Sequence, residues 1–214
     1  MTISEPGSYR LSGNLVLPNR STTAIEITAS DVTVDLNGFA ILAPECPGPP
    51  CSSFTTHGIA TGSGTTPRFN ITIRNGTFRH MAGDGVALSG NAHVVEYLHV
   101  RNSGASGISI VEGESGGSSI VQHSTLQANG AFGVRLLRGA VRNNVVSGNG
   151  STGIAVSEGS VAHNVATGNL AGIVMSPNGG AGAFGNVLRD NSAGNLVNGA
   201  NLGQNLCTGS GGLC

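Results

Sequence analysis

Hydrophobic residues alternate with small or polar residues in short stretches along this chain, and a glycine begins most of these stretches. The phrase glycine–apolar–any residue–apolar begins at seven positions, which are Gly58, Gly85, Gly107, Gly133, Gly153, Gly172 and, in a weaker form, Gly194. Alternation with a period of two is typical of β-strands, and no window has the period of an amphipathic helix. The pattern therefore predicts an all-β protein.

The copies of this phrase begin 19 to 27 residues apart, and asparagines repeat at a similar spacing. One asparagine series is Asn129, Asn149, Asn169 and Asn191, and a second is Asn144, Asn164 and Asn186. Self-similarity at this period is typical of a solenoid. Leucine-rich repeats, left-handed hexapeptide helices and calcium-binding nonapeptide repeats do not fit, because the leucine consensus, the stricter coil and the repeated aspartates are missing. The spacing predicts a single-domain right-handed parallel β-helix of roughly seven coils, each with three short strands.

The same pattern predicts which side chains fill the core. Inward apolar residues stack on their equivalents one strand spacing away, about 4.8 Å, and asparagine amides at equivalent turns hydrogen-bond along the axis. The expected inward residues of the glycine-led strands are Val86, Leu88, Ile108, Ile110, Val134, Leu136, Ile154, Val156, Ile173 and Met175.

Two N-terminal stretches resemble bacterial right-handed β-helix repeat proteins of the pectate-lyase-like superfamily. They are Thr2-Ile-Ser-Glu-Pro-Gly-Ser-Tyr-Arg-Leu and Thr23-Ala-Ile-Glu-Ile-Thr-Ala-Ser-Asp-Val-Thr-Val-Asp-Leu-Asn-Gly-Phe. The resemblance covers nearly the whole chain and implies one β-helix domain over 1–214. We expect an N-terminal segment and first coil at 1–42, a loop-rich insertion at 43–69, regular coils at 70–206 and a C-terminal disulfide loop at 207–214. Members of the superfamily include polysaccharide lyases, glycoside hydrolases, epimerases and adhesins, so the resemblance alone assigns no single activity.

The charge balance excludes several classes of partner. The ten basic residues are all arginine, and eleven acidic residues give a formal net charge of −1. No overall field therefore draws nucleic acid or a membrane surface to the chain. No apolar stretch approaches the length of a membrane span, about 18 residues, and the first residues lack the features of a secretory leader. We expect a monomer.

Four cysteines lie in two close pairs outside the repeats, Cys46 with Cys51 and Cys207 with Cys214. Short-loop disulfides fit this spacing and indicate an oxidising compartment. They favour a secreted or cell-surface protein whose signal peptide is outside this sequence. Free thiols are the alternative, and a four-cysteine zinc site lacks the usual Cys-x-x-Cys spacing.

Outward residues of equivalent strands form ladders along the predicted rod. Alignment of the coils on Val95, Val121, Val141 and Val161 predicts three ladders of polar residues. The first holds Asp35, Arg74, Glu96, Gln122 and Arg142; the second holds Thr77, His99, Thr125 and Val145; the third holds Arg79, Arg101, Gln127, Ser147, Thr167 and Arg189. Charged residues gather in the early coils. The outward positions of the glycine-led strands hold small or uncharged residues apart from Arg135.

The first ladder has two interpretations. Its alternating charges are typical of surface ion pairs between adjacent strands. Alternatively, four of its members are substrate-binding candidates, which are Arg74, Glu96, Gln122 and Arg142.

The like charges of Arg79 and Arg101 on adjacent strands repel each other. These two side chains extend into solvent, pair with Glu96 or Glu112, or bind an anion such as a uronate carboxylate, which a planar guanidinium suits. His99 is the only histidine beside both arginines. We therefore take His99 and Arg101 as candidate catalytic residues of a metal-independent lyase, with Arg79 as a further substrate contact.

Other rings rank lower as functional candidates. His123 and His163 occupy the position of Asn143, before the turn asparagine, where a hydrogen-bonding role in the stack is expected. Tyr97 is read as a turn or core residue, although sugar-binding sites often contain stacking aromatic rings.

The catalytic patterns of related enzymes do not transfer to this chain. Pectate lyases of this superfamily hold calcium with clustered aspartates, but Asp31, Asp35, Asp84 and Asp190 share no ladder. Glycoside hydrolases need two carboxylates flanking the scissile bond, and no tight pair is evident. We expect no cofactor, and calcium is the one alternative left open, although the sequence contains no clustered-aspartate site.

Two functions remain from different classes. The first is a secreted carbohydrate-associated β-helix that binds an acidic polysaccharide along the arginine and histidine face, with or without cleaving it by β-elimination. The second is a non-catalytic stalk or adhesin-like module whose polar ladders only solvate the rod. The scarcity of aspartate, lysine and aromatic residues favours the second function. The expected export, the fold and the arginine pair favour the first, which is our prediction.

Overall fold

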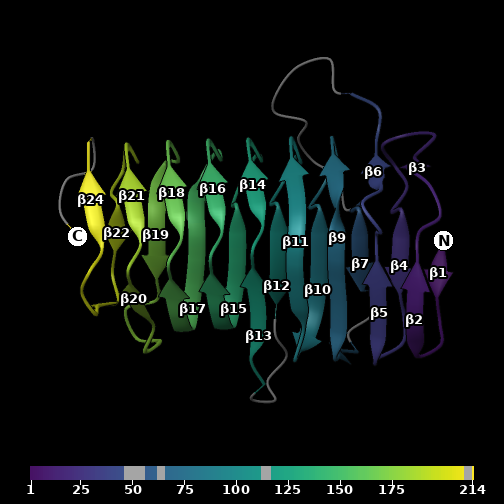
Figure 1. Ribbon diagram of the computed structural model, residues 1–214, viewed down its shortest axis with the longest axis horizontal. Helices are drawn as coiled ribbons and strands as arrows, with labels where there is room; N and C mark the ends of the chain where they lie inside the picture. The colour runs from purple at the N-terminus through teal and green to yellow at the C-terminus, as the bar shows by residue number, and fades with distance from the viewer. Residues whose placement is uncertain (46–55, 62–65, 112–116, 210–213) are drawn as a thin grey trace.

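The computed structural model describes residues 1–45, 56–61, 66–111, 117–209 and 214. Throughout these residues the regular elements are strands that pair in parallel and stack into one rod, with the two termini at opposite ends (Figure 1). The all-β, single-domain parallel solenoid expected from the repeat is therefore confirmed. Among the described residues, no helix is long and apolar enough to cross a membrane.

Three ladders of hydrogen-bonded strands form the walls of the rod. The first consists of β1 (Thr2–Ile3), β4 (Ile25–Ile27), β7 (Ile59–Thr61), β10 (Val86–Asn91), β12 (Ile108–Val111), β15 (Val134–Arg142), β17 (Thr152–Ala162), β19 (Ala171–Met175) and β22 (Leu196–Val197). The second consists of β2 (Gly7–Arg10), β5 (Val32–Asp35), β9 (Ile71–Arg79), β11 (Val94–Arg101), β13 (Ser119–Gln122), β15, β17, β20 (Gly182–Phe184) and β23 (Ala200–Asn201). The third consists of β3 (Leu15–Val16), β6 (Ala40–Leu42), β9, β11, β14 (Thr125–Gln127), β16 (Val145–Ser147), β18 (Val165–Thr167), β21 (Val187–Arg189) and β24 (Leu206–Thr208). The short β8 (Arg68–Phe69) pairs with the end of β10.

The rod has about nine turns rather than the seven that the glycine phrase predicts. The two additional turns stand at the N-terminus, where Thr2–Ile3 and Ile25–Ile27 join the first ladder. Ala24 stands at the position that Gly58 occupies in the next coil, and the first strand begins at Thr2 without a glycine before it in this sequence. A count based on glycine therefore misses two coils that are built in the same way.

The core confirms the predicted inward positions. All ten apolar residues assigned to the inside of the glycine-led strands are buried. The glycine before each strand is required by close packing of the coils. A Cβ on Gly133, for example, would lie 2.2 Å from a methyl group of Val146 and 2.6 Å from the Gly153 carbonyl oxygen.

Both predicted asparagine series form buried stacks along the rod axis. In the first, side-chain amides donate to the next side-chain oxygen from Asn129 to Asn149, Asn169 and Asn191 at 2.9 to 3.1 Å. In the second, the same contacts run from Asn144 to Asn164, Asn186 and Asn205 at 2.8 to 3.0 Å. Each buried amide thus finds its partners in adjacent coils, as burial of a polar group requires.

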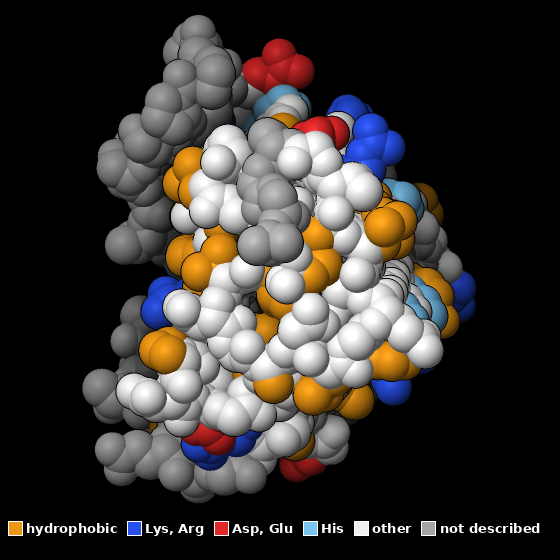
Figure 2. All heavy atoms as spheres, turned by 90° about the vertical axis from the view of Figure 1, so that its left-hand side faces the viewer, with side chains coloured by type: hydrophobic (Ala, Val, Ile, Leu, Met, Phe, Trp, Pro, Cys, Tyr) orange, Lys and Arg blue, Asp and Glu red, His pale blue; other side chains and the backbone are white. Residues whose placement is uncertain are grey.

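The C-terminal end carries the one predicted disulfide that lies within the described residues, Cys207–Cys214, with 5.6 Å between the Cα atoms. Cys46 and Cys51 lie outside the described residues. Figure 2 looks onto this end and shows mainly uncharged side chains. Leu202 and Leu206 are exposed there, and the disulfide joins β24 to the last residue of the chain.

Candidate functional site

The candidate site lies on the third ladder, where β9, β11 and β14 run side by side. The register pairs His99 with Thr77 and Thr125. It also pairs Arg101 with Arg79 on one side and with Gln127 on the other. The pairing predicted for the polar ladder of Thr77, His99 and Thr125, and for the ladder of Arg79, Arg101 and Gln127, is therefore confirmed. Their outward side chains surround a shallow hollow of about 190 Å³, lined by Thr77, Arg79, His99, Val100, Arg101, Thr125 and Gln127.

Arg79, His99 and Arg101 are exposed in this hollow. Within the described ranges, none of the three takes part in a side-chain hydrogen bond or an ion pair. Glu96, one expected partner, instead accepts a hydrogen bond from Gln122 at 2.7 Å. Glu112, the other, lies outside the described residues. Two guanidinium groups therefore face solvent on adjacent strands without a described carboxylate to balance them.

The polar ladder that begins with Asp35 and Arg74 lies on the neighbouring second strand ladder, and its side chains bond to each other. Arg74 Nε lies 3.2 Å from Asp35 Oδ2, so the ion pair predicted from the alternating charges is confirmed. Burial opposes the effect, but a hydrogen bond from the Asn37 backbone, another from Asn75 and the Arg74 charge lower the pKa of Asp35. This carboxylate therefore accepts hydrogen bonds from the turn at Asn37 and pairs with Arg74 of the next coil.

The other members of that ladder also bond to each other. Gln122 donates to Glu96 at 2.7 Å, and Arg142 Nε donates to Gln122 Oε1 at 2.8 Å. Arg74, Glu96, Gln122 and Arg142 thus already have intramolecular partners, in contrast to the arginines of the hollow. A substrate-binding role for these four residues remains a prediction.

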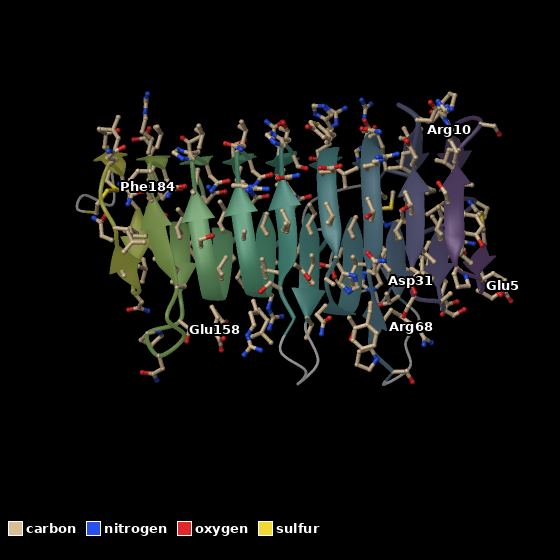
Figure 3. All side chains as sticks on the ribbon, turned by 60° about the horizontal axis from the view of Figure 1, so that its bottom comes forward. Glu5, Arg10, Asp31, Arg68, Glu158 and Phe184 are labelled. Atoms are coloured by element: carbon tan, nitrogen blue, oxygen red, sulfur yellow. A yellow bond between two sulfur atoms is a disulfide. The ribbon has the colours of Figure 1, made fainter. Side chains whose placement is uncertain are left out.

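The turn between the second and third strand ladders carries aromatic side chains that the sequence did not assign to a site. Tyr97 and His123 occupy equivalent left-handed backbone positions, with φ of 53° and 51°. Their rings stack with centroids 5.1 Å apart and planes 8° from parallel. Further along, His163 meets Phe184 edge-on at 5.5 Å, near the C-terminal end of the rod (Figure 3).

The expected hydrogen-bonding role of His123 and His163 is replaced by these ring contacts. The reason is the left-handed turn, which directs the side chain at this position outward. The residue that follows each histidine, Ser124 or Asn164, is buried and makes the bonds along the axis.

A second hollow, of about 300 Å³, lies over the outward face of β12, β15, β17 and β19. Its lining is largely apolar and includes Val111, Leu137, Ala155, Val174 and Arg135. This site could not be predicted from the sequence, because single apolar residues on an outward face carry no distinctive signal. Within the described ranges, no three His, Cys, Asp or Glu side chains group closely enough to hold a metal ion.

Comparisons with known proteins agree with the fold. Residues 57–208 match the family model described as "Right handed beta helix region". No curated protein matches the chain. The Dettilon tailspike protein (gp208) is similar in structure, with 13% identity, a TM-score of 0.48, and coverage of 98% of this chain and 59% of that chain. The chain therefore spans less than two thirds of the tailspike protein.

A second similar structure is the A-module of the mannuronan C-5 epimerase AlgE4 from Azotobacter vinelandii. It is 15% identical with a TM-score of 0.46, and the match covers 97% of this chain and 72% of that chain. Both similarities concern the fold alone.

Proposed function

We propose that this chain, which belongs to the right-handed β-helix family, binds an acidic polysaccharide in the hollow around Arg79, His99 and Arg101. The single observation that carries the proposal is the pair of exposed guanidinium groups on adjacent strands without a carboxylate partner among the described residues. Such a pair is stabilised when a carboxylate bridges it, because each guanidinium offers two parallel donors to an anion.

The same hollow contains groups suited to β-elimination on a uronate. The arginines would neutralise the sugar carboxylate, which makes the proton on the adjacent carbon more acidic. His99 would accept that proton. The electron pair would form a carbon–carbon double bond and expel the glycosidic oxygen, which would take its proton from water. His99 and Arg101 keep their assignment as candidate catalytic residues on this basis.

Binding is tested by titration of an oligogalacturonate hexamer into wild type and two variants, Arg79→Ala and Arg101→Ala. Loss of one charge-assisted contact should weaken binding about 10- to 100-fold. Salt should weaken the wild-type interaction steeply, because exposed charges are screened over about 8 Å at physiological ionic strength. Arg189→Ala is the matched control, because Arg189 belongs to the same predicted ladder but lies near the far end, beside Asp190 at 3.6 Å. Equal affinity for wild type and Arg101→Ala would reject the proposal and favour the non-catalytic stalk.

Cleavage is tested separately by the ultraviolet absorbance of an unsaturated product across a panel of acidic polysaccharides. The His99→Ala variant should bind the hexamer but form no product. Binding without any product in wild type would reject the lyase step and leave a binding module.

A further inference from the structure

The corner of the rod that adjoins the hollow presents an exposed aromatic ring. Tyr97 is 52% exposed and stands two residues before His99 on β11. His123 covers one face of the ring, and the two planes are nearly parallel. The stack limits the motion of the tyrosine side chain, so little conformational entropy remains to be lost when a ligand packs against it.

The opposite face of the Tyr97 ring has no aromatic neighbour among the described residues. Asn75 occupies the equivalent position in the preceding coil, because Arg74 pairs with Glu96 and Gly76 pairs with Leu98. The Asn75 amide donates to Asp35 at 3.2 Å, on the side away from Tyr97. A short asparagine side chain covers less of a six-membered ring than a second aromatic ring would, in keeping with the 52% exposure of Tyr97.

The positions of the arginine pair and of the Tyr97 ring indicate in which direction a bound oligosaccharide would run. Along the rod the charge ends quickly, since the ladder continues from Arg101 through Gln127, Ser147 and Thr167, all of them uncharged. Around the coil, Tyr97 precedes His99 by two residues and Arg101 by four, which is roughly 7 and 13 Å of extended chain. A saccharide that crosses the coil meets a ring face and then the arginine pair.

We infer that Tyr97 is a stacking subsite for a sugar ring, and that an acidic oligosaccharide crosses the coil from Tyr97 to the Arg79 and Arg101 pair. The carbon–hydrogen face of a pyranose is an apolar surface that packs on an aromatic ring, and tyrosine offers such a surface with few rotatable bonds. The inference rests on the proposed function, because the arginine pair supplies the other end of the binding site.

Tyrosine emission gives a direct readout of this contact. The chain has two tyrosines and no tryptophan, so a Tyr9→Phe background makes Tyr97 the only emitting residue of its kind. Two probes of equal length separate ring from charge, an oligogalacturonate hexamer and its fully methyl-esterified, neutral form.

Both probes should change the emission, and only the charged hexamer should show a salt-dependent affinity. Tyr97→Ala should weaken both probes about 3- to 10-fold, whereas Tyr97→Phe should retain binding. Arg101→Ala should weaken the charged hexamer alone. Circular dichroism of Tyr97→Ala checks that the fold is retained.

The outcomes separate the two proposals. Binding of the charged hexamer with unchanged emission, or with full affinity in Tyr97→Ala, overturns the stacking subsite while the arginine site stands. A response to the neutral probe that is lost in Tyr97→Ala, together with equal affinity of Arg101→Ala and wild type for the charged hexamer, supports the subsite and overturns the arginine site. No response to either probe overturns both.

Discussion

Removal of one buried asparagine should destabilise the rod more than its size suggests. The Asn164 side-chain oxygen accepts from the Asn144 backbone and side chain, both at 3.0 Å. The Asn164 amide donates to Val141 O at 2.9 Å, to Ala162 O at 3.0 Å and to Asn186 Oδ1 at 3.0 Å. Asn164 is 1% exposed, so water cannot replace these partners.

The magnitude follows from the groups that Asn164→Ala leaves behind. The Asn144 backbone N–H loses its acceptor inside the core, which costs about 1–3 kcal/mol, and two further hydrogen bonds contribute about 1 kcal/mol each. The side chains of Asn144 and Asn186 keep other partners. We expect the free energy of unfolding to fall by about 3–5 kcal/mol, and the melting temperature to fall by roughly 6–20 °C for a chain of this size.

The assay is urea and thermal unfolding followed by circular dichroism, with Asn178→Ala at an exposed turn as the control. The control should change the free energy of unfolding by less than about 0.5 kcal/mol. Asn164→Asp should be no more stable than Asn164→Ala, because its second oxygen would face three acceptors. A loss below about 1 kcal/mol in Asn164→Ala would refute the role given to the stack.

Two further predictions concern pH and the C-terminal end. Burial lowers the pKa of His93 to about 4, although a hydrogen bond with the Ser89 backbone opposes this shift. The unfolded chain therefore binds the proton more tightly than the folded chain. The free energy of unfolding has its full value above pH 6.5 and falls as the pH drops toward 4. Between pH 7.5 and 5 this histidine should lower the free energy of unfolding by about 2 kcal/mol. Unfolding curves of His93→Gln should therefore show a smaller pH dependence than wild type. An unchanged pH dependence would contradict the assignment. Reduction of Cys207–Cys214 should lower the free energy of unfolding by about 2–3 kcal/mol at most. Hydrogen exchange should then increase only in the last coil. A uniform increase along the rod would contradict a local role for the disulfide at the C-terminal end.

The fold was accessible from sequence because its signals are local and repeated. Alternation in strands such as Ile154–Val156 and the recurring glycines and asparagines fix the register of one coil on the next, and hence the pairing of Arg79 with Arg101. The sequence pattern places a first coil within 1–42, but a count of the glycine phrase omits both N-terminal turns, because Ala24 stands where the later coils have glycine.

The site was less accessible, because side-chain partners depend on rotamers and not on spacing. The ladder alone did not decide whether Glu96 would pair with an arginine or with Gln122. Likewise, the stack of Tyr97 on His123 depends on two left-handed backbone positions. A bulky aromatic residue such as tyrosine rarely adopts that conformation, so the sequence alone does not place Tyr97 at a left-handed turn.

Inversion of charge in the hollow shows whether Arg79 and Arg101 bind the anionic ligand. Oligogalacturonate and cationic chitosan oligomers of equal length are titrated into wild type and the Arg79→Glu/Arg101→Glu double variant at low salt. We expect wild type to bind the anionic oligomer, and the double variant to lose that affinity and to bind the cationic oligomer instead. Wild type without affinity for oligogalacturonate, or a double variant that binds it equally well, would show that the arginine pair is not an anion-binding site.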